Sequence, residues 1–415
     1  MRPLRTQPVF RRLWLGTTAS GFGSQLGTFA VTFYVWESSR SPLLVGLIGL
    51  FTAVPLIAFA LLGTAFADHV DRRRLALVTT LGQLATSLLM AGVAAGLRDR
   101  VWAMLVLVGV SSALAALNAP ARQAFLPRLL PAEQLSAGLA LNHLSFQLAM
   151  LLGPAVAGIL TAGWGTTLCF VVDALTFVAA LVGIRSLPPT RAADSDGRAG
   201  ASAAWQGIRF ALRTPPVRGA FLLDLCATVL AMPVALFPVV NEEKFHGSPE
   251  VLGLLTSAMA VGGVVASMLS GLITNSGRSG RVLLGCCAVW GASLAGVGLA
   301  GNLALVLVLL AVAGAADTWS VVSRGTIVQF STPESHRGRV ASLDFLVGAA
   351  GPRIGGLRAG LVAAASSGGT ALLVGGITCL AGIALTALAT PHLGRFTTAW
   401  PVPPGRDTTE PLVGA

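Results

Sequence analysis

Long apolar runs, separated by short polar stretches, dominate the chain from end to end. The hydrocarbon core of a bilayer is about 30 Å thick, so a helix that crosses it needs roughly 20 apolar residues. Twelve runs reach that length, over residues 13–37, 42–67, 75–97, 101–124, 134–162, 166–187, 217–241, 250–275, 281–300, 303–328, 339–364 and 367–391. The pattern therefore predicts an all-α polytopic membrane protein with twelve transmembrane helices.

A polar segment over residues 188–216 separates the first six runs from the last six. Its first part is rich in proline, glycine, serine and charged residues, which is typical of a linker. Its second part places Trp205, Ile208, Phe210 and Leu212 among arginines, a composition that predicts a short helix at the membrane surface. We expect an N-terminal six-helix bundle (1–187), a cytoplasmic linker (188–216), a C-terminal six-helix bundle (217–391) and a disordered cytoplasmic tail (392–415).

The two bundles should be pseudo-symmetric, because helix-breaking residues recur at similar places in both halves. Pro131 and Pro333 follow the fourth and tenth runs, 202 residues apart (333 − 131). A Gly-Pro pair interrupts the fifth run at Gly153 and the eleventh at Gly351, 198 residues apart (351 − 153). Near-constant offsets of this kind are what duplicated six-helix halves leave in a sequence.

Composition narrows the class of protein further. Apolar residues make up 54% of the chain, charged residues only 11%, and the mean hydropathy is +0.77. Soluble domains carry roughly 25% charged residues, so a soluble enzyme is excluded. The sequence has no G-x-S-x-G elbow, no phosphate-binding G-x-x-x-x-G-K-[ST] loop and no metal-ligand spacing, and its five cysteines fall inside apolar runs. We expect no catalytic residue, no metal and no cofactor.

The excess of positive charge in the chain is explained by its distribution between the two sides of the membrane. A net charge of +11 would suggest a nucleic-acid partner in a soluble protein. Here twenty-two of the 28 arginines and lysines, Arg324 among them, fall on the side of the termini and the linker, and four fall on the other side. The positive-inside rule then predicts a multi-pass protein of the cell inner membrane with both termini cytoplasmic and no nucleic-acid partner. We expect a monomer in the lipid bilayer whose outer acids, Glu37, Glu242 and Glu243, are solvated.

The densest cluster of charge lies between the second and third runs. Asp68 and Arg72 are four residues apart, a spacing that lets opposite charges meet on adjacent helical turns, and Arg73 and Arg74 extend the positive cluster. The stretch resembles the loop signature of the major facilitator superfamily, G-x-x-x-D-R-x-G-R-R. Asp68, Arg72 and Arg73 are in register, and the signature's first glycine, first arginine and inner glycine are replaced by Thr64, His69 and Asp71. The resemblance implies two six-helix bundles and a gating loop of these four charged residues that latches one conformation. The alternative is a basic loop that only sets topology.

A second motif interrupts the fifth run and recurs in the eleventh. It resembles the G-P-x-x-G-G signature of superfamily antiporters, which exporters carry more often than importers. The motif residues are Gly153, Pro154 and Gly158 in the fifth run and Gly351, Pro352, Gly355 and Gly356 in the eleventh. Proline removes a backbone hydrogen bond and glycine lets another helix approach closely, so both segments can bend and pack tightly. Simple helix packing is the alternative.

Further stretches narrow the resemblance. The chain reads N-A-P-A-R-Q-A-F-L-P-R-L-L-P-A-E-Q-L from Asn118 to Leu135, S-G-F-G-S-Q-L-G in the first run and T-P-E-S-H-R-G-R-V before the eleventh. These stretches are similar to the drug:proton antiporter group that includes enterobactin exporters and macrolide efflux proteins. The resemblance implies a secondary active transporter that exports an amphiphilic small molecule, such as a siderophore or a drug, by alternating access driven by the proton gradient. An importer or facilitator of the same fold is one alternative, and a membrane-embedded sensor or enzyme is another.

Ionisable residues inside apolar runs are costly and are therefore functional candidates. Asp173, Asp224 and Asp317 are the candidates for proton coupling. Asp317 lies deepest in its run and is the first choice, because low-dielectric surroundings let a carboxylate load and release a proton. Asp224 and Asp344 lie near span ends, where capping or snorkelling is an equal alternative.

Two arginines, Arg353 and Arg358, lie in the eleventh run and must face protein or water. A regular helix turns them roughly 140° apart, so they cannot both point into one cavity. Arg358 should serve structure near the outer surface. We expect Arg353 to bind an anionic group of the substrate, with an ion pair to an aspartate such as Asp317 or Asp224 as the alternative. The other candidates for substrate binding are Gln25, Asn118 and Trp319.

Overall fold

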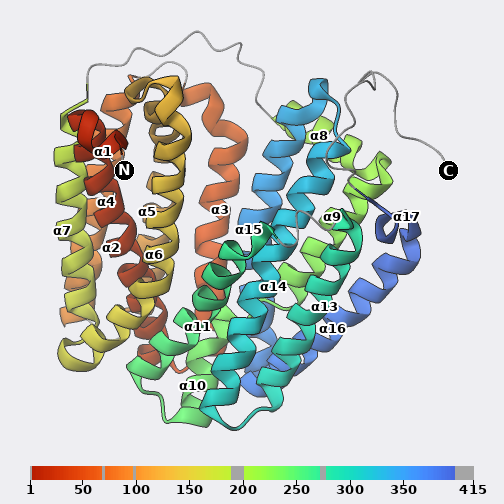
Figure 1. Ribbon diagram of the computed structural model, residues 1–415. Coiled ribbons are helices and arrows are strands. Elements are labelled where there is room, and N and C mark those ends of the chain that lie inside the picture. The colour runs from red at the N-terminus through yellow and green to blue at the C-terminus, as the bar shows by residue number, and fades with distance from the viewer. Residues whose placement is uncertain (1, 68–70, 97–99, 188–200, 272–276, 398–415) are drawn as a thin grey trace.

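The computed structural model describes residues 2–67, 71–96, 100–187, 201–271 and 277–397. Within these residues the regular structure is helical, without strands. Figure 1 shows two bundles side by side, the first built from the chain before the linker and the second from the chain after it. The predicted fold class, an all-α protein of two six-helix bundles, is confirmed.

The N-terminal bundle holds six long helices preceded by a short one. Its elements are α1 (Arg2–Thr6), α2 (Pro8–Ser39), α3 (Pro42–Ala67), α4 (Arg72–Gly96), α5 (Val101–Leu129), α6 (Ala132–Trp164) and α7 (Thr166–Arg185). Positive-φ residues end two of them, Arg40 after α2 (φ 49°) and Gly165 after α6 (φ 80°). Gly165 suits this backbone because it has no Cβ, so the chain reverses within one residue.

The C-terminal bundle follows helix α8 (Ala201–Arg213), which lies in the second part of the linker, where a helix is predicted. Its elements are α9 (Pro215–Leu225), η1 (Cys226–Leu230), η2 (Val234–Leu236), α10 (Phe237–Phe245), α11 (Pro249–Met268), α13 (Ser279–Leu299), α14 (Leu303–Phe330), η3 (Glu334–His336), α15 (Arg337–Ala365), α16 (Gly368–Ala389) and α17 (Pro391–Gly394).

Ten helical segments in the described part of the chain are long and apolar enough to cross a membrane. The other two long helices, α2 and α15, are less apolar, with Gln25 and several serines and threonines in α2 and Arg353 and Arg358 in α15. They complete the twelve helices that the sequence predicts. Large apolar side chains such as Val78, Trp102 and Val182 are at least 60% exposed. Such side chains are unfavourable in water and suit contact with lipid.

The seventh span differs from the uninterrupted helix predicted over 217–241. α9 passes into the π-helix η1, and the backbone leaves helical geometry at Ala231 (φ −134°) before η2 and α10 resume. Pro233 has no N–H to donate, and a proline also disfavours helical backbone at the residue before it. The helix is therefore broken in the middle of an apolar run, where hydrophobicity alone predicts continuity.

Two segments outside the spans pack on the C-terminal bundle. Helix α8 lies against the start of α15, and the ring of Phe210 stacks on His336 with 4.9 Å between ring centroids. Past the predicted end of the last span, Leu393 is fully buried and the backbone N–H of Gly280 donates to the carbonyl of Phe396. The chain therefore stays packed for several residues into the predicted tail, and residues 398–415 lie outside the described part.

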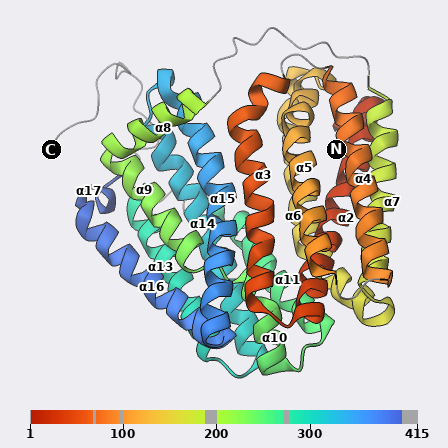
Figure 2. The ribbon, with the colours of Figure 1, turned by 180° about the vertical axis from the view of Figure 1, so that it is seen from behind.

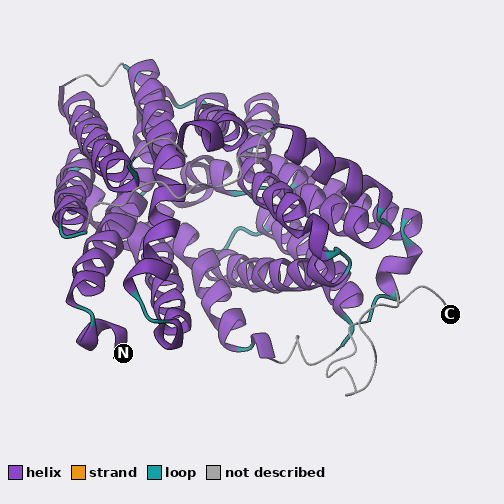
Figure 3. Cartoon of the chain, turned by 90° about the horizontal axis from the view of Figure 1, so that it is seen from above, coloured by secondary structure: helices purple, strands orange, loops and turns teal. Residues whose placement is uncertain are grey.

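We call the end of the molecule that carries α1, α8 and α17 the linker end, and the end where α2, α6 and α10 finish the turn end. Figures 1 and 2 show the bundles spreading apart toward the linker end and coming together at the turn end, where α10 meets α2. Figure 3 shows both bundles from the linker end. The most extensive contacts between the bundles are those of α3 with α15 and of α6 with α11.

Candidate functional site

The glycines of the fifth-span motif lie where α6 touches other helices. A Cβ placed on Gly153 would lie 2.5 Å from the Cβ of Gln25 in α2, and one on Gly158 would lie 2.6 Å from the carbonyl oxygen of Pro249 in α11. From the other side, a Cβ on Gly253 of α11 would lie 2.6 Å from the carbonyl oxygen of Pro154. A larger residue would force these helices apart. The motif thus sets a backbone contact between the two bundles.

The eleventh-span motif makes the corresponding contacts in α15. Gly351 and Gly355 lie against Thr228 of η1, within the C-terminal bundle. Farther along the same helix, Gly360 lies against Gly46 of α3, in the N-terminal bundle. In each bundle, the helix that carries the motif therefore packs on the first span of its own bundle and, farther along, on a helix of the other bundle. The two halves thus share helix contacts as well as sequence pattern.

Arg353 lies at the contact between α3 and α15. Its Nε donates a hydrogen bond to Oγ1 of Thr52 at 3.1 Å, across the two bundles, and its Nη1 donates to the carbonyl of Ala349 one turn earlier. Within the described residues it forms no ion pair, so the alternative prediction of a pair with Asp317 or Asp224 is wrong. The Nε–H group of Arg353 instead joins α15 to α3 through Thr52.

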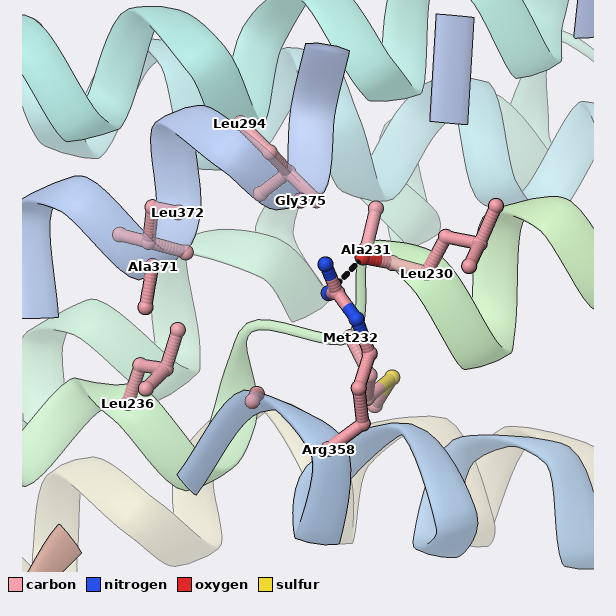
Figure 4. A pocket seen from close by; sticks show the side chains of 10 residues that line it. Leu230, Ala231, Met232, Leu236, Leu294, Arg358, Ala371, Leu372 and Gly375 are labelled. Atoms are coloured by element: carbon pink, nitrogen blue, oxygen red, sulfur yellow. Dashed lines mark hydrogen bonds between the residues drawn. The ribbon is translucent and has the colours of Figure 1, made fainter. Parts of the chain in front are cut away.

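Arg358 points into the C-terminal bundle and not toward the outer surface. Figure 4 shows it in a small pocket beside the broken seventh span, where its Nη1 donates to the carbonyl of Leu230. That carbonyl ends η1, and the helical hydrogen-bond ladder stops there because the backbone leaves helical geometry at Ala231. Nη2 also lies 3.5 Å from Oγ1 of Thr378 in α16. Arg358 therefore donates a hydrogen bond to a backbone carbonyl that the break in the seventh span leaves without a helical partner.

Three charged side chains form a cluster between α9, α14 and α15. Arg324, only 6% exposed, forms an ion pair with Asp224, and its Nε lies 3.2 Å from Oδ1 of Asp344. The sequence analysis counts Arg324 only as a positive charge of the linker side, and the structure shows that α14 carries it inside the bundle. Asp224 and Asp344 are likewise partners of an arginine and not helix caps.

Asp317, the first candidate for proton coupling, lies seven residues before Arg324, so the two share a face of α14. Its carboxylate interacts electrostatically with Asp224 and Arg324, but it makes no hydrogen bond or ion pair with any residue that the structure describes. Trp319, two residues on, donates its indole N–H to the carbonyl of Ala266 at 2.9 Å and so braces α14 on α11. Asp317 is thus a carboxylate without a fixed partner beside a fixed charge cluster.

Asp173 lies apart from that cluster, inside the N-terminal bundle. It is 7% exposed, and Oγ of Ser87 donates to its Oδ2 at 2.8 Å. Room for the carboxylate comes from α2, where Gly23 and Gly27 face it and a Cβ on Gly27 would lie 3.2 Å from Oδ2. Its Oδ1 is buried without a hydrogen-bond partner in the described chain. Asp173 and Asp317 are therefore carboxylates without an ion pair in the described chain, one in each bundle, and of these two only Asp173 accepts a hydrogen bond from a hydroxyl.

Asp68 of the predicted gating loop lies outside the described residues, so its pairing with Arg72 stays a prediction. Arg73 donates to the carbonyl of Arg185 at 2.8 Å and ties the start of α4 to the end of α7. Oδ1 of Asp71 accepts from the backbone N–H groups of Arg73 and Arg74 at 2.8 and 3.1 Å. Asp71 thus caps α4, which explains why an aspartate is stable where the resembled signature has glycine.

The two remaining candidates for substrate binding lie in the N-terminal bundle. Asn118 is 3% exposed, and its Nδ2 lies 3.3 Å from Oγ1 of Thr80 in α4, so it faces neighbouring helices. Gln25 is half-buried and packs on Gly153. The side chain of Gln25 is therefore more accessible to solvent than that of Asn118.

The turn end carries contacts that the sequence does not reveal. Arg40 joins Glu37 of its own helix to Glu242 of α10, so the pair Arg40–Glu242 links the two bundles. Glu243 accepts from the backbone N–H groups at the start of α16, and Lys244 donates to the carbonyls of residues 297, 298 and 300 at the end of α13. All three outer acids are exposed, as expected, but each also has a protein partner, and Glu243 suits the positively polarised start of α16.

A groove of about 830 Å³ opens beside these contacts at the turn end. It lies over the ends of α2, α4 and α6 and the starts of α7 and α11, with Tyr34, Thr161, Trp164 and Glu250 among its lining residues. None of the charged residues of the α9, α14 and α15 cluster lines it. The groove and the charge cluster are therefore separate features.

Comparison with known proteins gives a consistent result. Residues 1–398 match the model of a family described as transmembrane secretion effectors. The enterobactin exporter EntS of Shigella boydii is 27% identical over 388 residues, which cover 91% of this chain and 92% of that protein, and the enterobactin exporter EntS of an Escherichia coli strain matches to the same extent.

Solved structures resemble the fold at lower identity. A bacterial homologue of the iron transporter ferroportin in an inward-facing state has a TM-score of 0.73 at 16% identity, covering 93% of this chain and 98% of that one. A bacterial homologue of the human lysosomal transporter Spinster has a TM-score of 0.67 at 16% identity, covering 94% and 97%. At such identities the likeness establishes the fold.

Proposed function

The chain belongs to the transmembrane secretion effector family of the major facilitator superfamily, and from this premise we propose that it exports an amphiphilic small molecule across the inner membrane in exchange for protons. It is a multi-pass inner-membrane transporter. Export is supported by its enterobactin-exporting relatives, and a siderophore or a drug of similar character is the proposed cargo.

The observation that carries the proposal is the way the bundles meet. Glycines let α6 approach α11 and α15 approach α3 at backbone distance, and these contacts sit near the turn end, at Gly158 with Pro249 and at Gly46 with Gly360. A smooth glycine contact allows two rigid bundles to rock against each other. Alternating access by such rocking would open the linker end and the turn end in turn.

Transport into inverted membrane vesicles tests direction and coupling together. With the vesicle interior acidified, we expect labelled enterobactin or a labelled macrolide to accumulate inside vesicles that contain the protein, and a protonophore should abolish the accumulation. Vesicles from cells without the protein are the control. Accumulation only in right-side-out vesicles would favour an importer, and accumulation unaffected by the protonophore would remove proton coupling from the proposal.

Orientation is a separate prediction, which rests on the excess of arginines at the linker end. We expect a cysteine introduced at Gln206 of α8 to be shielded from an impermeant thiol reagent in intact cells, and one introduced at Gly301 to be labelled. Both positions are exposed, and a Cβ at Gly301 has nothing within 4 Å, so the changes should be tolerated. The native cysteines are buried or half-buried, which lowers the background. Equal labelling at both positions would contradict the proposed orientation.

A further inference from the structure

The pseudo-symmetry of the bundles places one arginine at equivalent positions of α5 and α14. Arg122 and Arg324 are 202 residues apart (324 − 122), the same offset as Pro131 and Pro333, and each lies nine residues before its proline. The starts of α5 and α14 also differ by 202 residues (303 − 101). The duplicated fold thus gives each bundle an arginine toward the linker end of its fourth span.

The surroundings of the two arginines differ in charge. Arg324 is held between Asp224 and Asp344. Asp344 lies seven residues before Gly351, the first motif glycine of the C-terminal bundle. The residue seven before the equivalent Gly153 is Phe146. The same two glycines contact Gln25 in α2 and Thr228 in η1. Asp224 lies four residues before Thr228, and the residue four before Gln25 is Gly21. The N-terminal bundle has therefore kept the arginine without either carboxylate.

Arg122 accordingly has no partner among the described residues. It makes no hydrogen bond and no ion pair with them, and its side chain is exposed. A guanidinium stays charged at any physiological pH and carries five N–H donors, so an exposed one is available to water or to an anion. The N-terminal bundle supplies neither of the carboxylates that satisfy its counterpart.

The face of α5 that carries Arg122 is turned away from the exposed apolar face of the same helix. Val106, 54% exposed, marks the outer face, and a helix turns Ala115 and Arg122 about 180° and 160° away from it. Both are exposed. Met104 lies eighteen residues before Arg122, five full turns away on the same face, and is fully buried. One interior face of α5 is therefore closed toward the turn end and accessible toward the linker end.

We propose that Arg122 binds an anionic group, a carboxylate or a catecholate, of the exported molecule as it enters from the linker end. The proposal rests on the proposed export function and names the charge of its substrate. A planar guanidinium with free donors forms paired hydrogen bonds to such a group, which a lysine or an amide does not reproduce. Arg353, the candidate from sequence, already donates across the bundle contact, whereas Arg122 donates to none of the residues that the structure describes.

Ligand-dependent thermal stability of the purified protein tests this binding without requiring transport. The probes are salicylate and salicylamide, which share a ring and a hydroxyl but differ in charge. We expect salicylate to raise the thermal midpoint of the wild-type protein and salicylamide to have little effect. Arg122→Gln should weaken salicylate binding about tenfold or more, Arg122→Lys should restore part of it, and Arg128→Gln, an exposed change later in α5, should bind as the wild type does.

Two further arms separate the possible sources of the anion. The same shift measured with inorganic phosphate, and in lipid nanodiscs with and without phosphatidylglycerol, tests a free phosphate and a lipid headgroup. Stabilisation through Arg122 by phosphate or phosphatidylglycerol but not by salicylate would overturn the assignment to the exported molecule. Equal salicylate binding by the wild type and Arg122→Gln would overturn the site itself. Because these assays need no gradient, failure of export in vesicles with intact salicylate binding would count against the proposed function alone.

Discussion

Replacing Arg324 with glutamine is expected to lower the thermal midpoint of the protein strongly and to abolish export. Arg324 is 6% exposed and compensates Asp224 and Asp344 at once. Removing it leaves the Asp224 carboxylate, 10% exposed, without its partner in the interior of the bundle, and an uncompensated buried charge costs about 3–5 kcal/mol. Asp344, 36% exposed, also loses its partner but keeps contact with water. Thermal unfolding in detergent and the amount of protein in the membrane measure the effect.

A second substitution makes the Arg324 test specific. Adding Asp224→Asn to Arg324→Gln removes one of the stranded charges, so the double variant should recover part of the lost stability. Arg337→Gln is a matched control, because Arg337 is exposed at the start of α15 and loses only a surface charge. A single variant that unfolds at the wild-type temperature would show that the cluster is not what holds α9, α14 and α15 together.

Replacing Asp317 with asparagine is expected to reduce gradient-driven export at least tenfold while leaving exchange of substrate down its own gradient. The side chain has nearly the same shape and no fixed partner in the described chain, so the fold should tolerate the change, but the amide cannot carry a proton. Vesicle uptake with an imposed pH gradient, compared with counterflow without one, separates the two activities.

Asp173→Asn is the comparison for Asp317→Asn. Asp173 is enclosed by α2 and accepts from Ser87, so its replacement should disturb packing in the N-terminal bundle before it alters coupling. Persistent gradient-driven export by Asp317→Asn would move the coupling site to another carboxylate, with Asp173 and Asp224 as the next to test.

Most of the helical architecture follows from the sequence because apolar length is a local property. The runs over 42–67, 166–187 and 303–328 correspond closely to α3, α7 and α14. The break at Ala231 is different, since Pro233 only permits it and the contact from Arg358, more than one hundred residues later, satisfies the carbonyl that it exposes. The hydrophobic pattern around Pro233 therefore cannot predict that a side chain from a distant helix will bind this carbonyl.

Side-chain partners were the least predictable part of the site for the same reason. Arg324 lies in an apolar run, and that position alone signals a buried partner, but its nearness to the end of the run also fits a solvated loop. Its partners come from α9 and α15, and only the fold brings them together. The motif glycines were easier, because a glycine in a spanning helix predicts a close approach whatever the partner is.

Glu243 and Lys244 fasten α10 to the C-terminal bundle, so α10 must travel with that bundle, and Glu242 beside them is left to reach across to Arg40. Both members of that pair are close to half exposed, at 46% and 42%. Such a pair is weak in dilute solution and weaker still when mobile ions screen it. Under the alternating access proposed above, closure of the turn end should therefore weaken as the salt concentration on that side of the membrane rises.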